Sequence, residues 1–359
     1  MLLIVGWKFV YFDMQSAFEK ILTVRDQDKK NARIIGESRQ GRPIFAFRYG
    51  QGPLGLSLLA GCHADEPVGP RFLRALCSYL AFLPADHRWF KDYTWHLIPH
   101  INPDGEIVNQ RWYDDTDETY DLVSYLKFRV REKPGDDIEF NFPFDSSDQG
   151  ARLENRAVYD WWRDQNIPFH LHCSLHGMTG GAGPWFLIEP TWIGRTQKLR
   201  TRCEEQVHEM GYKLHDIERQ GEKGFHRISP GFCTRPDSQA MRDFFMSRND
   251  PETAHKFRPS SMESIRSLYG DVLTLVSEMP LFIFPGIGEK LGPPDPVAEQ
   301  WKERLETWTN ELEKGNETLV RREVGQSGLR AMPVRHQMKL QWRFITAGIK
   351  AVQRYQGID

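Results

Sequence analysis

The apolar positions of the chain alternate between short continuous runs and runs with helical spacing. Apolar residues recur every three or four positions in 71–82 and 157–162, as expected for helices that bury one face. Strands that alternate with helices in this way predict an α/β fold with a mixed, mostly parallel central sheet flanked by helices. The strands are predicted where short apolar or aromatic runs are bounded by glycine, proline or polar residues, at 44–49, 56–60, 93–98, 169–175 and 272–276.

The last part of the chain has a different pattern. Asp295 is suited to be the N-cap, and Pro296 the first residue, of an amphipathic helix. A second apolar pattern with helical spacing runs from Trp342 to Val352. Such stripes more often pack onto a core than form a binding surface, although the binding surface is the alternative. We therefore predict a main domain at 1–290 and a helical extension at 291–359 that packs on it.

Charge and cysteine content narrow the class of protein. The 47 basic and 49 acidic residues leave a formal net charge of -2, which favours neither nucleic acid nor an anionic membrane surface as a partner. The 5 cysteines are odd in number and lack close pairing, which favours reduced thiols over a disulfide framework. The apolar run at the start of the chain ends at Lys8, and no later run is long enough to span a bilayer. We expect a soluble, cytoplasmic protein.

A candidate metal site begins directly after the predicted strand at 56–60. His63 follows the end of this strand at Gly61, and Glu66 lies three residues further on. Imidazole nitrogen and carboxylate oxygen are ligands that zinc accepts, and a catalytic zinc usually has three protein ligands and an open position for water. An HxxE pair also occurs by chance in strand-to-helix loops, so the hypothesis requires a third ligand.

Three histidines are candidates for that third ligand. His170, His172 and His176 are spaced by two, so in an extended strand they project to one face. His176 stands at the end of the predicted strand, where the carboxyl edge of the sheet would meet the His63 loop, and it is therefore the predicted ligand. His170 and His172 are interpreted as structural or supporting residues, with His172 the better candidate for supporting a ligand.

A hydrolytic zinc site also needs a base for the attacking water and a positive group for the developing oxyanion. Glu278 follows an apolar strand and can supply the base. Arg111 follows the turn at Asn102–Gly105 by a few residues and can supply the positive group. Each could be an ordinary strand-end or loop residue, but one hypothesis places both at the sheet edge with the ligands.

Several short motifs together resemble the zinc carboxypeptidase family, in the order found in that family. The resemblance implies a mixed sheet flanked by helices and one zinc ion held by His63, Glu66 and His176. It also implies that Glu278 is the general base and Arg111 the arginine that polarises the carbonyl. The motifs span Gly36 to Pro280 and lie at Gly36–Pro43, His63–Glu66, Asn102–Gly105, Glu154–Ala157, Ser174–His176 and Thr274–Pro280.

The chain departs from the family's pattern in the segment Asp137–Pro143. Most carboxypeptidases of the family have an Asn-Arg pair there that grips the terminal carboxylate of the substrate. In this chain Glu139 and Phe140 stand at the two positions, so a carboxylate would meet a like charge or an apolar ring. Glu139 could attract a positively charged group of the substrate, or it could pair with a neighbouring arginine.

The family's lid tyrosine is also absent from the segment Ala254–Pro259, where it is expected. His255 or Arg258 could take over part of its role. Another arginine, such as Arg227 or Arg235, could hold a substrate carboxylate from a different direction.

These features predict a zinc-dependent hydrolase of peptide or amide bonds. A metallocarboxypeptidase of unusual specificity, acting on a peptide, is the first hypothesis. The alternative is a zinc amidase or deacylase that acts on a modified peptide, a cell-wall fragment or an acyl amino acid. A non-catalytic binding protein on the same fold is a third hypothesis, and the complete set of ligands together with Glu278 argues against it. The sequence indicates no oligomeric state.

Overall fold

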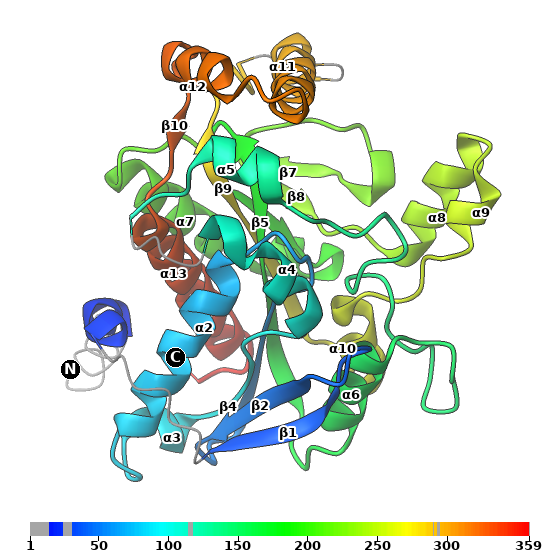
Figure 1. Ribbon diagram of the computed structural model, residues 1–359. Helices are drawn as coiled ribbons and strands as arrows, with labels where there is room; N and C mark the ends of the chain where they lie inside the picture. Colours follow the sequence, from blue (N-terminus) through cyan, green and yellow to red (C-terminus); the bar gives the residue numbers. More distant parts are fainter. Residues whose placement is uncertain (1–13, 24–30, 114–117, 290, 293–294, 359) are drawn as a thin grey trace.

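The structure is a computed structural model that describes residues 14–23, 31–113, 118–289, 291–292 and 295–358. The N-terminal apolar run that entered the expectation of a cytoplasmic protein lies outside these residues. The described residues form a ten-stranded mixed sheet with helices on both faces (Figure 1). The predicted α/β class and the mixed sheet are confirmed.

The order of the strands across the sheet is β1-β2-β4-β3-β5-β9-β6-β8-β7, and β10 pairs with β9. The strands are β1 Ala32–Glu37, β2 Pro43–Tyr49, β3 Leu54–Ala60, β4 Tyr93–Ile98, β5 Phe169–Gly181, β6 Trp185–Ile188, β7 Arg227–Ser229, β8 Phe232–Thr234, β9 Leu273–Ile283 and β10 Arg330–Ala331.

The parallel part of the sheet is its centre. Strands β4, β3, β5 and β9 run parallel to one another, while most of the other pairings in the sheet are antiparallel. Parallel strands end at the same edge of a sheet, so the loops that follow β3 and β4 lie close together. Residues in the second halves of β5 and β9 lie at this edge too, and it is here that the candidate site forms.

Two apolar layers cover the sheet. On one face α2, α7 and α13 pack over a large core that contains Trp89, Trp95 and Trp342. On the other face α6 and α10 pack over a smaller core around Trp162 and Phe169. The helices are α2 Val68–Phe82, α3 Arg88–Asp92, α4 Pro103–Tyr113, α5 Leu122–Phe128, α6 Leu153–Arg163, α7 Gln197–Glu209, α8 Ser238–Ser247, α9 Pro251–Ala254, α10 Ser261–Tyr269, α11 Pro296–Glu313, α12 Glu317–Gln326 and α13 Val334–Tyr355, with 3-10 turns at Pro190–Arg195 and Glu222–Gly224 and a helix at 14–23.

The predicted strands and helices are present, but β5 and β9 are longer than predicted. They pair with each other as far as Gly181 and Ile283, well beyond the apolar runs that predicted them. Continuous pairing keeps the backbone extended even where polar side chains interrupt the apolar pattern. The placement of His176 and Glu278 at strand ends is therefore wrong, because both lie inside strands.

The C-terminal helices occupy two different places. Asp295 caps α11 as predicted, since its carboxylate accepts hydrogen bonds from Val297 N and Ala298 N. Helices α11 and α12 lie at the periphery (Figure 1), whereas α13 packs between α2 and α7 on the sheet and so belongs to a main layer of the fold. The apolar residues Trp301, Trp308 and Trp342 of these helices are buried, and the division into a main domain and an extension at residue 291 stays a prediction.

Two further observations concern the cysteines and the helices. All 5 cysteines are buried and free of disulfides. Among the described residues, no helix combines the length and the apolar character needed to cross a bilayer.

Candidate active site

The turn after β3 places the first two candidate ligands. Gly61 has a φ of +80°, and a Cβ added there would lie 2.4 Å from the His100 ring, so glycine is needed at this position. The chain then carries His63 inward and reaches Glu66 just before α2 begins. A carboxylate at the N-terminus of a 15-residue helix is favoured by the helix dipole.

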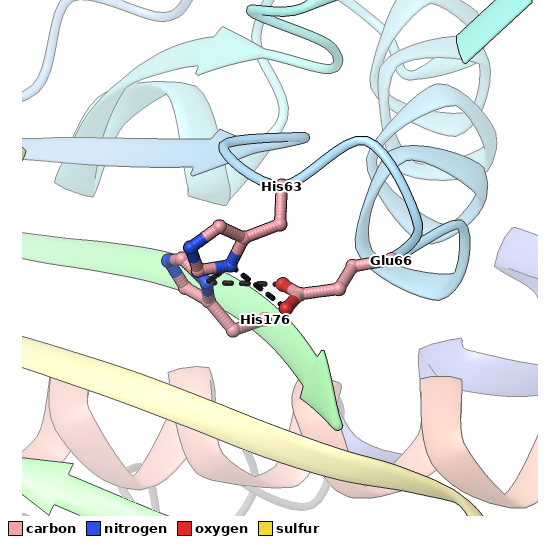
Figure 2. A group of neighbouring side chains, drawn as sticks. All are labelled: His63, Glu66 and His176. Carbon is pink, nitrogen blue, oxygen red and sulfur yellow. Dashed lines mark hydrogen bonds and ion pairs between the residues drawn. The ribbon is translucent and has the colours of Figure 1, made fainter. Parts of the chain in front are cut away.

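His63, Glu66 and His176 come together as the sequence predicts (Figure 2). His63 Nδ1 lies 2.8 Å from Glu66 Oε1, and His176 Nδ1 lies 3.0 Å from Glu66 Oε2. The two Nδ1 atoms are 3.2 Å apart, and all three side chains are buried. The Gly177 backbone N–H also donates to Glu66 Oε2 at 3.1 Å, so the carboxylate is held from both sides.

Charge within this group shifts each of its pKa values. Burial and Arg131 act to lower the pKa of His63, but Glu66 and Glu139 outweigh them and hold it well above the ordinary value. Burial acts to raise the pKa of Glu66, yet the two histidines hold it well below its usual range. A buried carboxylate that stays ionised beside two imidazoles is a strong site for positive charge.

Two polar groups hold the outer nitrogens of the histidine rings. Glu139 Oε2 lies 3.0 Å from His63 Nε2, and Ser174 Oγ lies 2.8 Å from His176 Nε2. Partners on the outer nitrogens fix the rings so that both Nδ1 atoms face inward. His172 does not take part: its ring lies between the hydroxyls of Ser57 and Ser261, and the role expected for it belongs to Ser174.

The donor set fits a zinc ion. Two imidazole nitrogens and a carboxylate are ligand types found in catalytic zinc sites, and their ligand atoms all lie within 4.8 Å of one another. The fixed orientation of the rings adds to the fit, because ligating histidines usually have their second nitrogen bound by an oxygen. His63, Glu66 and His176 could therefore hold one ion.

Glu278 lies beside this group on the neighbouring strand. It pairs with His176 across β5 and β9, so the two side chains share a face of the sheet. Glu278 is half-buried, and burial together with the charges of Glu66 and Glu139 raises its pKa to about 8. A cation held by the three ligands would lower this pKa toward neutrality, where a carboxylate acts well as a general base.

The arginine at the site is Arg131, and the structure does not bring Arg111 there. Arg111 lies in the last turn of α4 with its guanidinium over Phe128, 4.2 Å from the ring centroid, and is exposed. Arg131 Nη1 lies 3.0 Å from Asp65 Oδ1 and 3.2 Å from Glu66 Oε1. The placement of Arg111 at the site failed because sequence distance from a turn does not determine which face of a helix a residue occupies.

The segment Asp137–Pro143 departs from the expected substrate contacts. Phe140 is 4% exposed and packs edge-to-face on Phe257, with 5.4 Å between the ring centroids. Its ring is therefore buried away from solvent, and its contact with substrate stays a prediction. Glu139 binds the outer nitrogen of His63, a contact that the sequence did not indicate.

The other cationic candidates for substrate binding either form ion pairs with carboxylates of the protein or are exposed on its surface. Arg258 forms an ion pair with Asp148, and His255 is exposed at the end of α9. Arg227 binds both oxygens of Asp216 at 2.8 and 2.9 Å. Arg235 is buried against Glu189 at 2.8 Å. The three arginines are each neutralised by a carboxylate of the protein.

The remaining sequence motifs bind one another and support the site. Asp104, from the turn after β4, accepts hydrogen bonds from Ser38 Oγ at 2.7 Å and Arg42 Nη1 at 2.6 Å. Asn155 Nδ2 donates to Ile138 O at 2.7 Å and so holds the segment that presents Glu139. These motifs have structural roles that their sequence order alone does not reveal.

Sequence reasoning missed Arg131 and the contact of Glu139 with His63. Arg131 lies six residues before Asp137, but nothing in the local pattern distinguishes it from Arg129. Only the long-range contacts with Asp65 and Glu66 identify it.

Comparisons with known proteins agree with this site. A family model described as zinc carboxypeptidase matches residues 23–185, a region that contains His63, Glu66, Arg131 and His176. Carboxypeptidase Z of Gallus gallus is 26% identical over 211 residues, which cover 47% of this chain and 31% of that protein. An inactive metallocarboxypeptidase, ecm14 of Talaromyces marneffei, is 24% identical over 168 residues, which cover 36% of this chain and 26% of that protein. The chain thus spans less than a third of the length of either relative.

Among solved structures, the carboxypeptidase A of Helicoverpa armigera is 12% identical, with a TM-score of 0.47 over 96% of this chain and 73% of that one. The family match, rather than this likeness, carries the assignment. Together with the relatives and the His-Glu-His group, it shows that residues 23–185 are similar to the zinc carboxypeptidase family.

Proposed function

We propose that this protein is a zinc-dependent hydrolase of peptide or amide bonds, and first of all a metallocarboxypeptidase of unusual specificity. The observation that carries the proposal is the convergence of His63, Glu66 and His176 with Glu278 beside them on the same sheet face. A zinc ion bound by these ligands would act as a Lewis acid, which activates a water and polarises the substrate carbonyl.

The residues of the chain divide the remaining work. Glu278 takes the proton of the attacking water and delivers it to the leaving amine, as its raised pKa allows. Arg131 replaces Arg111 in this proposal as the positive group near the developing oxyanion, because it contacts Glu66 directly. Glu139 orients His63 and thereby holds its Nδ1 toward the ion.

A zinc amidase or deacylase is the second candidate, favoured by the segment Asp137–Pro143. Phe140 is buried in an aromatic cluster, and Glu139 faces His63, so neither offers a positive group to a terminal carboxylate. A substrate whose end is blocked or modified would not need such a group. The complete set of ligands and Glu278 argues against the non-catalytic alternative, although one relative is named as inactive.

The test is hydrolysis by the zinc-loaded protein of three substrate classes: peptides with a free carboxylate, C-terminally amidated peptides and N-acyl amino acids. We expect cleavage of at least one class, loss of activity with a chelator, and a fall in kcat of about 10²–10⁴-fold in Glu278→Gln. Release of C-terminal residues only from free-carboxylate peptides supports the carboxypeptidase. Cleavage of blocked or acylated substrates supports the amidase or deacylase. Zinc binding without turnover of any class would contradict both.

A further inference from the structure

Two cationic side chains flank one aromatic ring at a distance from the metal group, and a third lies near them. Lys223 Nζ lies 4.5 Å from the Phe244 ring centroid, and the Arg248 guanidinium lies 4.3 Å from it on the same helix. Arg219 precedes Lys223 by four residues, and its charge lowers the pKa of Lys223. We call Arg219, Lys223 and Arg248 the basic cluster.

Among the described residues, two of the three cations in the basic cluster have no close carboxylate partner. Arg219 pairs with Glu222 at 3.2 Å, but in the described part of the chain no carboxylate lies within ion-pair distance of Lys223 or Arg248. Other acids lie on the same surface: Glu218, which accepts a hydrogen bond from Gln220 N at 2.7 Å, and Asp243, which lines a pocket together with the three cations. Burial and the charges of Arg219 and Arg248 lower the pKa of Lys223, although the charge of Glu222 opposes them. An anion bound here would relieve that repulsion.

The basic cluster lies on the catalytic face of the sheet. Glu278 is directly paired with His176 on one side and with Trp185 on the other, so these three side chains form a row on one face. Trp185 packs on Phe225 with 5.1 Å between the ring centroids, and the Arg219 guanidinium lies 4.6 Å from the Phe225 ring centroid. Two buried aromatic rings, Trp185 and Phe225, thus lie between Glu278 and Arg219.

A cavity of about 1150 Å³ extends from the basic cluster to the second half of β5. All three cations of the basic cluster line it, together with Phe244 on α8, residues of α11, and Thr179 and Gly180 on β5. Thr179 follows His176 by three residues, a distance of about 10 Å along an extended strand. A substrate held at the metal group would therefore need about three further residues to enter the cavity, and more to reach the cations.

The substitution at Phe140 is structurally linked to the cluster. Phe140 packs on Phe257, which stacks on Phe245 with 5.3 Å between the centroids. Phe245 in turn contacts Phe244, the ring that Lys223 and Arg248 flank. The residue at the usual clamp position therefore supports the helix that carries one of the unpaired cations.

We propose that the basic cluster binds a carboxylate of the substrate at a distance from the scissile bond, in place of a clamp at Glu139 and Phe140. This inference rests on the proposed function, because it names the substrate class of the same site. The carboxylate is either the free C-terminus or an acidic side chain, and both would present the same charge to Lys223 and Arg248.

Binding is measured by calorimetry with three acetylated hexapeptide probes, which are long enough to reach from the metal group to the cations, and the zinc-loaded Glu278→Gln protein, which turns them over slowly. Acetyl-Ala-Ala-Ala-Ala-Ala-Gln carries only a terminal carboxylate, acetyl-Ala-Ala-Ala-Ala-Ala-Glu-amide only an acidic side chain, and acetyl-Ala-Ala-Ala-Ala-Ala-Gln-amide neither. We expect one charged probe to bind at least about tenfold more tightly than the neutral one, and its identity gives the source of the carboxylate. The double substitution Lys223→Gln and Arg248→Gln removes this advantage. Arg248→Gln alone, at an exposed position, reduces it.

The control is Lys198→Gln with Arg322→Gln, which removes the same two charges from exposed positions on α7 and α12. It should keep the full preference for the charged probe. Equal binding of all three probes, no binding of any probe, or an advantage that survives in the double variant of the cluster would overturn the inference.

Cleavage is measured separately in the protein that retains Glu278. Equal kcat/KM for charged and neutral substrates would leave the hydrolase standing and reject the cluster. Carboxylate-dependent binding without any cleavage would retain the cluster and reject the hydrolase.

Discussion

The two ends of the catalytic face differ in how the protein treats its charges. At the metal end, Glu66 lies between two histidines and Arg131, and Glu139 binds the outer nitrogen of His63. At the other end, Lys223 and Arg248 flank Phe244 without a carboxylate within ion-pair distance among the described residues. Groups with many internal partners are held in place before a ligand arrives, whereas cations without counter-charge are free to meet one.

This difference suits the metal end to the chemical step and the basic cluster to the recognition of substrate. The metal end has the donor set and geometry that the zinc carboxypeptidase family implies. The segment Asp137–Pro143, where the family usually binds the terminal carboxylate of the substrate, makes contacts within the protein instead. Glu139 contacts His63, and Phe140 packs in an aromatic cluster. Substitutions at the metal end should change zinc binding and turnover, and those at the basic cluster should change only substrate affinity.

The largest effect is expected from removal of a ligand. His176→Ala should lower zinc affinity by more than the 10–100-fold that loss of a supporting hydrogen bond usually costs, because a donor to the ion itself is lost. Competition with a chelating dye measures the affinity. If the variant binds zinc as tightly as the native protein, His176 is not a ligand.

The next effect separates the two arginines. Arg131→Met should lower kcat by about 10²–10³-fold at saturating zinc, since it removes the positive group nearest the ligands. Arg111→Met is the matched control and should stay within about twofold of native, because its guanidinium lies over Phe128. Steady-state kinetics on one cleaved substrate compares them. The reverse ranking would restore the role first predicted for Arg111.

A smaller effect distinguishes support of a ligand from contact with substrate at Glu139. Glu139→Gln keeps the shape but weakens the bond to His63 Nε2, so zinc affinity should fall by about 10–100-fold. Glu299→Gln, an exposed substitution on α11, should leave zinc affinity unchanged. An unchanged zinc affinity in Glu139→Gln, together with an altered KM, would instead assign Glu139 to the substrate.

The smallest effect is a change of stability with pH in the metal-free protein. Because the pKa of Glu278 is raised to about 8 from an ordinary value near 4.5, the folded protein retains a proton that the unfolded chain releases between these values. Glu278 therefore costs stability progressively as pH rises through this window. Glu278→Gln should raise the Tm by about 2–4 °C at pH 8 and leave it unchanged at pH 4. A Tm difference that is the same at both pH values would show that the pKa of Glu278 is not raised.

Much of the fold was predictable because the apolar runs that form β2, β3, β4 and α2 are also the segments that the core buries. The lengths of β5 and β9 were not, because pairing between the two strands extends them past Ser174 and Ser277, where the apolar pattern ends. Local pattern therefore predicts the existence of an element better than its end.

The metal group was also predictable, since His63, Glu66 and His176 are a ligand set whose motifs occur in a known order. Arg131 and the contact of Glu139 were not, because both depend on where loops of different length return to the sheet edge. The basic cluster could not be predicted from the sequence either, because Lys223 and Arg248 are 25 positions apart. Only the fold brings them to one aromatic ring.

The central claim is that one zinc ion, held at the metal end, works together with Glu278. The most direct test titrates zinc into the metal-free protein while cleavage of a substrate from the panel is followed, in native and Glu278→Gln forms. Activity of the native protein should rise to a plateau at one equivalent, while Glu278→Gln binds the same equivalent and remains about 10²–10⁴-fold slower. No turnover at one equivalent, or equal turnover in the two proteins, would contradict the account.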